Sequence, residues 1–212
     1  SLGGFTMSHL REDSPILRVL HIGKYFPPHR GGMETALRDQ INIQVRDEGL
    51  TVAAVVHSSN RRLTDIVETH PPGYRVRHAA RYFTAIFAPI APFFAWSAYR
   101  EIEDFNPDEI RIHMPNLSAG WLLLLANARY KKWTVIWHSD VVPSRYSIGL
   151  RIFYEIYRLI ETAILRRADT IVATSPPYLE TSAPLAKFRK KCRVEPLELD
   201  VERVRAINPS AP

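Results

Sequence analysis

The sequence is poor in cysteine and lacks the short motifs of several common enzyme classes. Cys192 is the single cysteine among 212 residues, which excludes a disulfide framework and a thiolate metal cluster. The motifs Gly-x-Gly-x-x-Gly, Gly-x-x-x-x-Gly-Lys-Ser/Thr and Gly-x-Ser-x-Gly are absent. Their absence argues against nicotinamide-binding Rossmann enzymes, P-loop NTPases and α/β serine hydrolases. The histidines also lack the i,i+4 or cysteine-paired spacing of zinc sites, so we expect no metal site.

The charge balance is basic, with 28 Lys and Arg against 22 Asp and Glu, giving a formal net charge of +6. A basic protein suits acidic ligands, an anionic membrane surface or nucleic acid. The basic residues are scattered and none of the standard nucleic-acid motifs is present, so we expect no nucleic-acid partner. The length fits one large domain with a sizeable core.

Residues 17–34 carry the first organising feature, a strand followed by a glycine turn and a helix. Residues 17–22 are mostly apolar, Gly23 ends this run, and Gly31 and Gly32 precede an apolar stripe with i+4 spacing. The stripe consists of Met33, Leu37, Ile41 and Val45. A helix start behind glycines can hold a phosphate through its unpaired N–H groups. The alternative is that the glycines only make a tight turn.

The rest of the chain alternates between strand and helix patterns. We expect strands at 51–56, 65–68, 74–78, 109–113, 133–138, 170–174 and 192–195. We expect helices at about 92–105, 117–129, 146–167 and 177–188. Such alternation predicts an α/β protein with a Rossmann-like, mainly parallel sheet and helices on both faces. Residues 201–212 are charged and then rich in proline, which is typical of a linker or a frayed end.

Polar side chains gather where these strands end. His113 and Asn116 follow one strand, His138 and Ser139 follow the next, and Ser175 follows a third. In an open α/β sheet, ligands bind beyond the carboxyl ends of the strands, so we expect a candidate site there. No strand end offers the paired carboxylates of a glycosidase. Asp140 alone is more typical of a cap or a solvated group.

A charge-free aromatic segment spans residues 82–99, between Arg81 and Arg100. Its length would admit a membrane span, but Pro89 and Pro92 and the soluble patterns on either side argue against one. The basic ends and the aromatic content suit a membrane interface. The alternative is that these aromatic side chains belong to the core.

Several segments resemble glycosyltransferase family 4. Phe26-Pro27-Pro28 followed by Gly31-Gly32-Met33-Glu34 resembles the family's first loop, and Trp137-His138-Ser139-Asp140 resembles its histidine loop. Residues 171–176 and 194–200 resemble its domain-junction region, with Glu198 standing where the family usually has glycine. The likeness extends over most of residues 17–200.

The resemblance implies the amino-terminal, acceptor-side half of a GT-B enzyme that uses a nucleotide sugar as substrate, with no metal and no other cofactor. It places Gly31 and Gly32 at the donor diphosphate, His138 at the transferring sugar and Ser175 at the domain junction. The acceptor-side residues that it implies are His113, Asn116 and Ser139. The reaction would be retaining, and the acceptor a lipid-linked or cell-surface glycan.

The implied organisation has residues 1–13 as a tag or disordered terminus, 14–200 as the domain, and 201–212 as a linker into a carboxy-terminal domain outside this sequence. We expect a cytoplasmic protein that contacts the inner face of an anionic membrane through the segment from Arg81 to Arg100. Two alternatives stay open at this point. One is a sugar-nucleotide epimerase of related architecture, and the other is a non-catalytic anion-binding or membrane-associated module.

Overall fold

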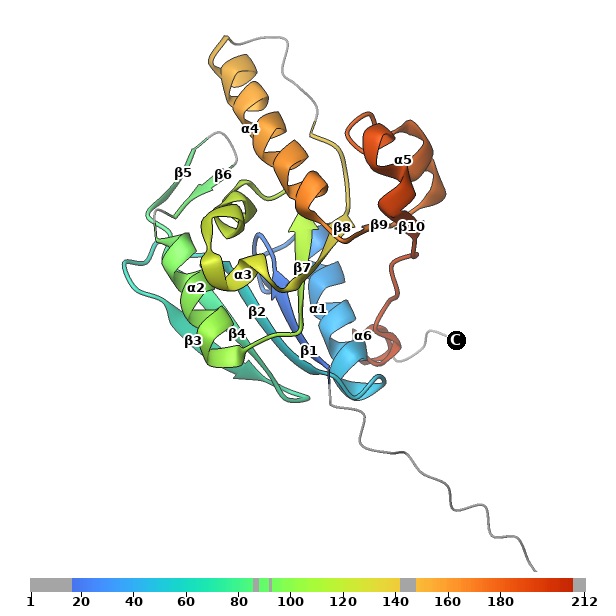
Figure 1. Ribbon diagram of the computed structural model, residues 1–212. Helices are drawn as coiled ribbons and strands as arrows, with labels where there is room; N and C mark the ends of the chain where they lie inside the picture. The colour runs from blue at the N-terminus through green and yellow to red at the C-terminus, as the bar shows by residue number, and fades with distance from the viewer. Residues whose placement is uncertain (1–16, 86–87, 92, 142–147, 208–212) are drawn as a thin grey trace, which may run out of the picture.

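The computed structural model describes residues 17–85, 88–91, 93–141 and 148–207 of the chain. Its centre is an eight-stranded sheet in the order β10-β9-β8-β7-β1-β2-β4-β3 (Figure 1). The strands are β1 (Arg18–Ile22), β2 (Thr51–His57), β3 (Ile66–His70), β4 (Tyr74–Ala79), β7 (Glu109–Met114), β8 (Lys132–Trp137), β9 (Thr170–Ala173) and β10 (Cys192–Val194). Neighbouring strands pair in parallel except for the antiparallel pair of β3 and β4. The predicted mainly parallel α/β sheet is confirmed.

The central strands are apolar on both sides because both faces of the sheet are covered. Along β2, Ala53 and Val55 belong to the core cluster on one face. Val52, Ala54 and Val56 belong to the cluster on the other face. Consecutive residues of the strand face opposite sides, and both sides are covered, so the strand is a continuous apolar run rather than an alternating one.

The helices divide between the two faces of the sheet. The longer ones are α1 (Gly32–Arg46), α2 (Phe94–Phe105) and α4 (Ile148–Arg167). Leu37 and Ile41 of α1 pack on one face. Phe94 and Ile102 of α2 and Ile164 of α4 pack on the other. The amino-terminal part of α4 extends past the carboxyl end of β7, the edge where the candidate site is expected (Figure 1).

Two predicted helices are wrong in form. The range 117–129 is a 3₁₀ helix, η1 (Leu117–Leu124), followed by the single turn α3 (Ala126–Arg129). A Cβ on Gly120 would lie 2.6 Å from Ile160 Cγ2, so η1 approaches α4 more closely than a larger residue would allow. The range 177–188 divides into α5 (Pro176–Thr181) and η2 (Ala186–Lys191). Pro184 lies between them and cannot continue the hydrogen-bond ladder of a helix.

The aromatic segment after Arg81 is only partly helical. It begins with a separate antiparallel pair, β5 (Phe83–Ala85) and β6 (Ala88–Ile90), and α2 follows. Within α2, Phe94 is fully buried against the sheet, whereas Trp96 is 58% exposed. Phe93, just before the helix, is 57% exposed. The segment therefore contributes both to the core and to the surface.

The range expected as a linker begins with a helix, α6 (Val201–Ile207). Arg203 donates two hydrogen bonds of 2.6 Å to the carboxylate of Asp39 on α1. Arg46 of α1 donates to Asp200 at 3.1 Å and to Glu202 at 2.8 Å. These ion pairs fasten α6 to α1, which Figure 1 shows beside it. The range 1–13, expected to be a tag or disordered, lies outside the described residues.

Candidate functional site

The carboxyl ends of β1, β7, β8 and β9 form one continuous edge, since these strands are parallel neighbours in the sheet. The loops that follow them carry the residues predicted from the sequence. His138 begins the loop after β8, and its backbone N–H donates to the Met114 carbonyl at the end of β7. Ser139 is partly buried in the same loop. Ser175 lies just after β9, where its carbonyl accepts from Leu179 N–H of α5.

A chain of hydrogen-bonded imidazoles crosses the sheet at this edge. His138 Nε2 lies 2.9 Å from His113 Nδ1, and His113 Nε2 lies 2.9 Å from His21 Nδ1. His21 Nε2 lies 2.9 Å from Gln44 Oε1 on α1. Each ring comes from a different strand or strand end, and α1 provides the terminal amide. The chain therefore joins the candidate residue His138 to the middle of the domain.

Gln44 fixes the order of protons along this chain. An amide oxygen can only accept, so His21 Nε2 carries the hydrogen and its Nδ1 keeps a lone pair. His113 Nε2 must then donate to His21, and His138 Nε2 must donate to His113. Because a neutral imidazole carries one N–H, His138 Nδ1 is left with a lone pair. His138 can accept a hydrogen bond from a ligand hydroxyl there.

Burial keeps these imidazoles neutral. Desolvation lowers the pKa of His21 to about 3, with Arg111 acting in the same direction and Gln44 and Glu109 opposing it. Desolvation also lowers the pKa of His138 to about 4. It lowers the pKa of His113 well below its usual value, reinforced by both neighbouring histidines and by Arg111. At neutral pH the one-way proton order therefore holds.

A carboxylate, that of Glu34, already lies beside the glycine turn before α1. Gly31 precedes the first residue of α1 and no side chain caps this helix end. The carboxylate of Glu34 occupies the space that a Cβ on Gly31 would need, whereas Gly32 has open space around it. Burial lowers the pKa of the nearby Lys24 amine, and the charge of Glu34 opposes this effect. An incoming phosphate would meet the field of Glu34 as well as that of the helix end.

Two of the predicted acceptor residues are turned into the fold. Asn116 is 3% exposed; its amide donates to the Gly23 carbonyl at 3.0 Å and accepts from Ser118 N–H at 3.2 Å. His113 is 1% exposed and is the central ring of the imidazole chain. Direct binding of an acceptor would require either side chain to leave these partners. The structure instead shows both as supports of the strand ends.

Asp140 also has a structural position. Its Oδ1 accepts from Trp137 Nε1 at 2.9 Å and from Ser182 Oγ at 2.7 Å. These bonds tie the loop after β8 to the segment between α5 and η2. Both donors are side chains and neither is a helix N–H, so these contacts do not make Asp140 the cap that the sequence suggested.

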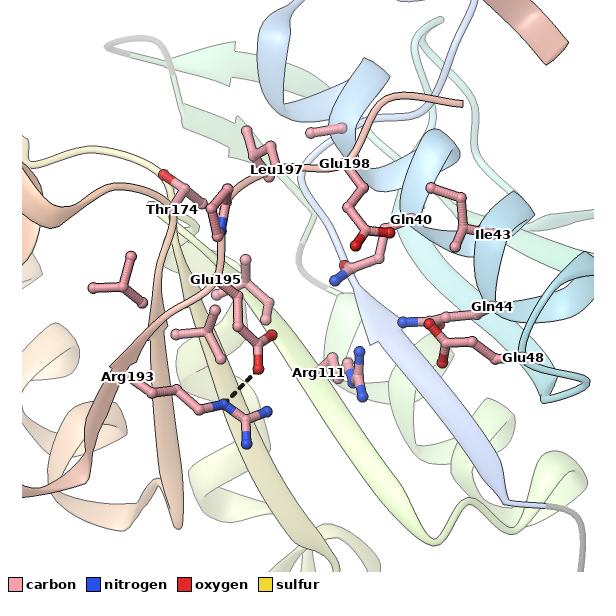
Figure 2. A pocket seen from close by; sticks show the side chains of 15 residues that line it. Gln40, Ile43, Gln44, Glu48, Arg111, Thr174, Arg193, Glu195, Leu197 and Glu198 are labelled. Atoms are coloured by element: carbon pink, nitrogen blue, oxygen red, sulfur yellow. Dashed lines mark ion pairs between the residues drawn. The ribbon is translucent and has the colours of Figure 1, made fainter. Parts of the chain in front are cut away.

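A pocket of about 410 Å³ borders the imidazole chain on the α1 face of the sheet. Gln40 and Gln44 of α1 line one side, Arg111 of β7 lies at the sheet, and the segment after β10 forms the opposite wall (Figure 2). Arg193 of β10 and Glu195 of that wall form an ion pair of 2.7 Å. Glu198, the residue at the position of the family's glycine, lines the same pocket. The pocket is polar and reaches His21 through Gln44.

Sequence reasoning missed His21, Gln44 and Arg111 as parts of this site. His21 interrupts an otherwise apolar strand, and Arg111 occupies a strand whose alternate residues are apolar and buried. A basic side chain on the inner face of a central strand was therefore the available signal. The role of Gln44 carried no signal, since it depends on how α1 lies over β1.

Among the residues that the structure describes, no helix has the length and apolar character needed to cross a membrane. Sequence comparison shows relatives that are named as sugar transferases. The chain is 29% identical over 189 residues to the O-antigen chain mannosyltransferase C of Escherichia coli, covering 87% of this chain and 46% of that protein. It is 28% identical over 193 residues to the D-rhamnosyltransferase WbpZ of Pseudomonas aeruginosa, covering 87% of this chain and 45% of that protein. The chain thus spans about half the length of these curated relatives.

Structure comparison supports the same fold. The sucrose-phosphate synthase of Thermosynechococcus elongatus superposes with a TM-score of 0.61 at 18% identity, over 85% of this chain and 48% of that chain. At this identity the likeness concerns the fold alone. The sequence model of Glycosyltransferase Family 4 matches residues 30–203, from the glycine turn to α6. The predicted resemblance is confirmed, and the chain belongs to Glycosyltransferase Family 4.

Proposed function

We propose that this chain is the amino-terminal, acceptor-side half of a nucleotide-sugar-dependent glycosyltransferase that builds an O-antigen type of polysaccharide. The observation that carries the proposal is the family match over residues 30–203. The relatives named as a mannosyltransferase and a D-rhamnosyltransferase favour a hexose or a deoxyhexose as the transferred sugar. The acceptor in this proposal is a lipid-linked or cell-surface glycan.

A second domain would provide the other wall of the site. The matched region covers less than half of each relative, and sugar transfer requires donor and acceptor to be fixed together in a site that excludes water. Residues 14–200 form the acceptor-side domain in this proposal, and residues 201–212 lead toward the other half. Ser175 lies at the junction, and the donor diphosphate approaches Gly31 and Gly32.

His138 is the side chain that we assign to the reaction. Its lone pair at Nδ1 can accept from a hydroxyl of the transferring sugar, and the imidazole chain behind it holds the ring in one orientation. A positioned group of this kind acts on the transition state more than on ground-state binding. The proposed reaction retains anomeric configuration, needs no metal at this site, and uses the nucleotide sugar as substrate with no other cofactor. Ser139, next to His138, faces the acceptor in this arrangement.

The test is a transfer assay on the protein that contains both halves. Mannose and rhamnose donors activated as nucleoside diphosphates are offered with a lipid-linked glycan acceptor. The variant His138→Ala should lower kcat more than it raises KM. Arg129→Ala is the matched control, because Arg129 is exposed on α3 next to the amino end of β8, and its kinetics should be unchanged. Residues 1–212 alone should bind sugar nucleotide weakly and should not transfer sugar.

Three outcomes would contradict this proposal or a part of it. Sugar transfer by residues 1–212 alone would overturn the two-half account, and an unchanged kcat in His138→Ala would remove the role of this residue. Reversible change of the sugar nucleotide without an acceptor would indicate an epimerase instead.

We also propose that the segment from Arg81 to Arg100 contacts an anionic membrane on its cytoplasmic face. Exposed aromatic side chains support this: Phe93, Trp96 and Tyr99 are 57%, 58% and 37% exposed, and Arg100 beside them is exposed. Aromatic rings with basic neighbours suit the boundary between lipid headgroups and acyl chains. Phe93→Ser with Trp96→Ser should abolish sedimentation with anionic vesicles at low salt. Tyr130→Ser, at an exposed aromatic residue just after α3, should not abolish it. The proposal would be refuted if the unmodified protein, the Phe93→Ser/Trp96→Ser variant and Tyr130→Ser all sedimented with the vesicles to the same extent.

A further inference from the structure

The edge of the sheet opposite β10 carries a cluster of metal-binding side chains. Glu68 and His70 belong to β3, and His78 belongs to its antiparallel neighbour β4. The three ligating atoms lie within 4.8 Å of one another. The alternation of these paired strands places the three side chains on one face of the hairpin. The cluster is separate from the imidazole chain at His138, which belongs to other strands.

The spacing of the atoms matches a four-coordinate metal ion. Glu68 Oε2 lies 3.4 Å from His70 Nε2 and 3.2 Å from His78 Nε2. In a tetrahedral site with metal–ligand bonds of about 2.0–2.1 Å, neighbouring ligands are about 3.3–3.4 Å apart. The two distances that involve Glu68 fit such an ion, and the two imidazole nitrogens lie within 4.8 Å of each other. Octahedral ligands at the same bond length would lie closer together, at about 3 Å.

The two imidazole nitrogens have no other partner in the described part of the chain. His70 Nε2 and His78 Nε2 are buried, and neither makes a hydrogen bond of acceptable geometry. Both lie within ion-pair distance of the Glu68 carboxylate. Buried polar atoms are normally hydrogen-bonded, so this pair of nitrogens is an exception that requires an explanation. A cation that both nitrogens ligate provides one.

Packing holds the rings in place before any ion binds. The ring of Phe26 lies 5.3 Å from that of His70 and 6.5 Å from that of His78, measured between centroids. Tyr74 stacks on His70 at 5.4 Å. Rings fixed in this way lose little side-chain entropy on binding a metal. Phe26 also begins the loop that leads to the glycine turn, so the two histidine rings of the cluster support this loop through their contact with Phe26.

Glu68 supplies a negative charge for the cation, and its side chain is 53% exposed. Its exposure leaves a direction open to solvent for a water ligand. Two imidazoles, one carboxylate and an open position form a set that Zn²⁺ accepts.

We propose that Glu68, His70 and His78 form a zinc site that clips the β3–β4 hairpin and braces the loop beginning at Phe26. Sequence reasoning excluded a metal site because it looked for i,i+4 or cysteine-paired spacing along the chain. Here the ligands come together across an antiparallel hairpin, with Ile66 opposite His78 and His70 opposite Tyr74. The site concerns the stability of the hairpin and the loop and is independent of the proposed sugar transfer.

The test uses residues 1–212 freed of metal and titrated with Zn²⁺ alone by calorimetry. We expect one ion per chain, and each of Glu68→Gln, His70→Gln and His78→Gln should weaken binding by at least about tenfold. His29→Gln and Glu155→Gln are controls of the same residue types outside the cluster, and they should bind as the unmodified chain does. Zn²⁺ should raise the Tm of the unmodified chain and of both controls. At the same Zn²⁺ concentration it should raise the Tm of the ligand variants less.

Co²⁺ provides a second readout, because its visible absorption distinguishes four-coordinate from six-coordinate sites. The single cysteine, Cys192, lies on β10 at the opposite edge of the sheet, so no thiolate absorption is expected. Glu68 is exposed, and Glu68→Gln should fold even if a histidine variant does not. The proposal is overturned if Zn²⁺ does not bind saturably, or if it binds Glu68→Gln as tightly as the unmodified chain.

Discussion

The change Gln44→Leu removes the acceptor that sets the proton order in the chain of His21, His113 and His138. Gln44 is 1% exposed, and its Oε1 lies 2.9 Å from His21 Nε2. If the proton order were reversed while the amide oxygen of Gln44 stayed toward His21, two lone pairs would face each other at this contact. Forfeiting the bond and leaving a buried polar group unpaired costs about 1–3 kcal/mol. The observed order should therefore be favoured by about 5- to 150-fold.

Leucine has a similar size and offers neither a donor nor an acceptor, so it removes this preference. In Gln44→Leu, both orders leave His21 Nε2 without a partner, and His138 should populate its two neutral tautomers in comparable amounts. The free energy of unfolding should also fall by about 1–3 kcal/mol, because a buried imidazole N–H loses its acceptor. Gln44→Glu keeps an acceptor in place and should preserve the single tautomer.

The assay is nitrogen-15 NMR of the histidine side chains in residues 1–212, which separates protonated from unprotonated ring nitrogens. Gln40→Leu is the matched control, because Gln40 lies one turn away on α1 and lines the same pocket. Its spectrum should match that of the unmodified chain. A single unchanged His138 tautomer in Gln44→Leu would refute the proton-order reasoning. A tautomer change in Gln44→Glu would refute it as well.

Four further predictions concern charged groups. Arg203→Met should lower the free energy of unfolding by about 3 kcal/mol, because the fully buried Asp39 loses a bidentate partner while Arg38 stays 4.0 Å away. Urea unfolding measures this loss against the exposed control Arg205→Met. A loss equal to that of the control would contradict the prediction. Burial lowers the pKa of His57 to about 4. The protein should therefore lose stability as pH falls below about 6.5 toward 4, with up to about 3 kcal/mol of the loss due to this group. The urea midpoint should change less with pH across this range in His57→Gln than in the unmodified chain. Burial raises the pKa of Glu161 to about 7, and its Oε2 is buried without a partner. Glu161→Gln should therefore stabilise the chain at pH 8 by up to about 3 kcal/mol and change its stability little at pH 4.5. Equal changes in stability at both pH values would argue against this prediction. Glu34→Gln should tighten phosphate binding at the glycine turn, because it removes the charge beside Gly31; phosphate titration followed by NMR should show no gain in Glu155→Gln.

The sequence by itself determined the strands of the main sheet, the main helices and the edge where the site lies, but not the small β5–β6 pair. A central strand that is covered on both faces must be apolar on both, as β2 is, and such runs are visible without coordinates. The apolar stripe of α1 follows the helical period and appears as expected. Parallel strands place their carboxyl ends on one side, so the placement of His113 and His138 at one edge was predictable.

Local helix form was decided by packing instead. The apolar range 117–129 has a helical composition, yet the close approach of Gly120 to Ile160 accompanies a 3₁₀ turn there. The helix α6 forms in a charged segment because Arg203 meets Asp39, which lies 164 residues earlier in the chain. Neither partner predicts the other, because the contact exists only after α1 is placed on the sheet.

The tertiary structure also decided which side chains act together. Strand register brings His21, His113 and His138 into hydrogen-bonding range, and the placement of α1 brings Gln44 to the end of that row. Hairpin pairing likewise brings His78 to Glu68 and His70. Spacing along a chain reveals such groups only within one helix or one strand. Across strands, the distance between two side chains depends on register and twist, which the whole sheet sets together.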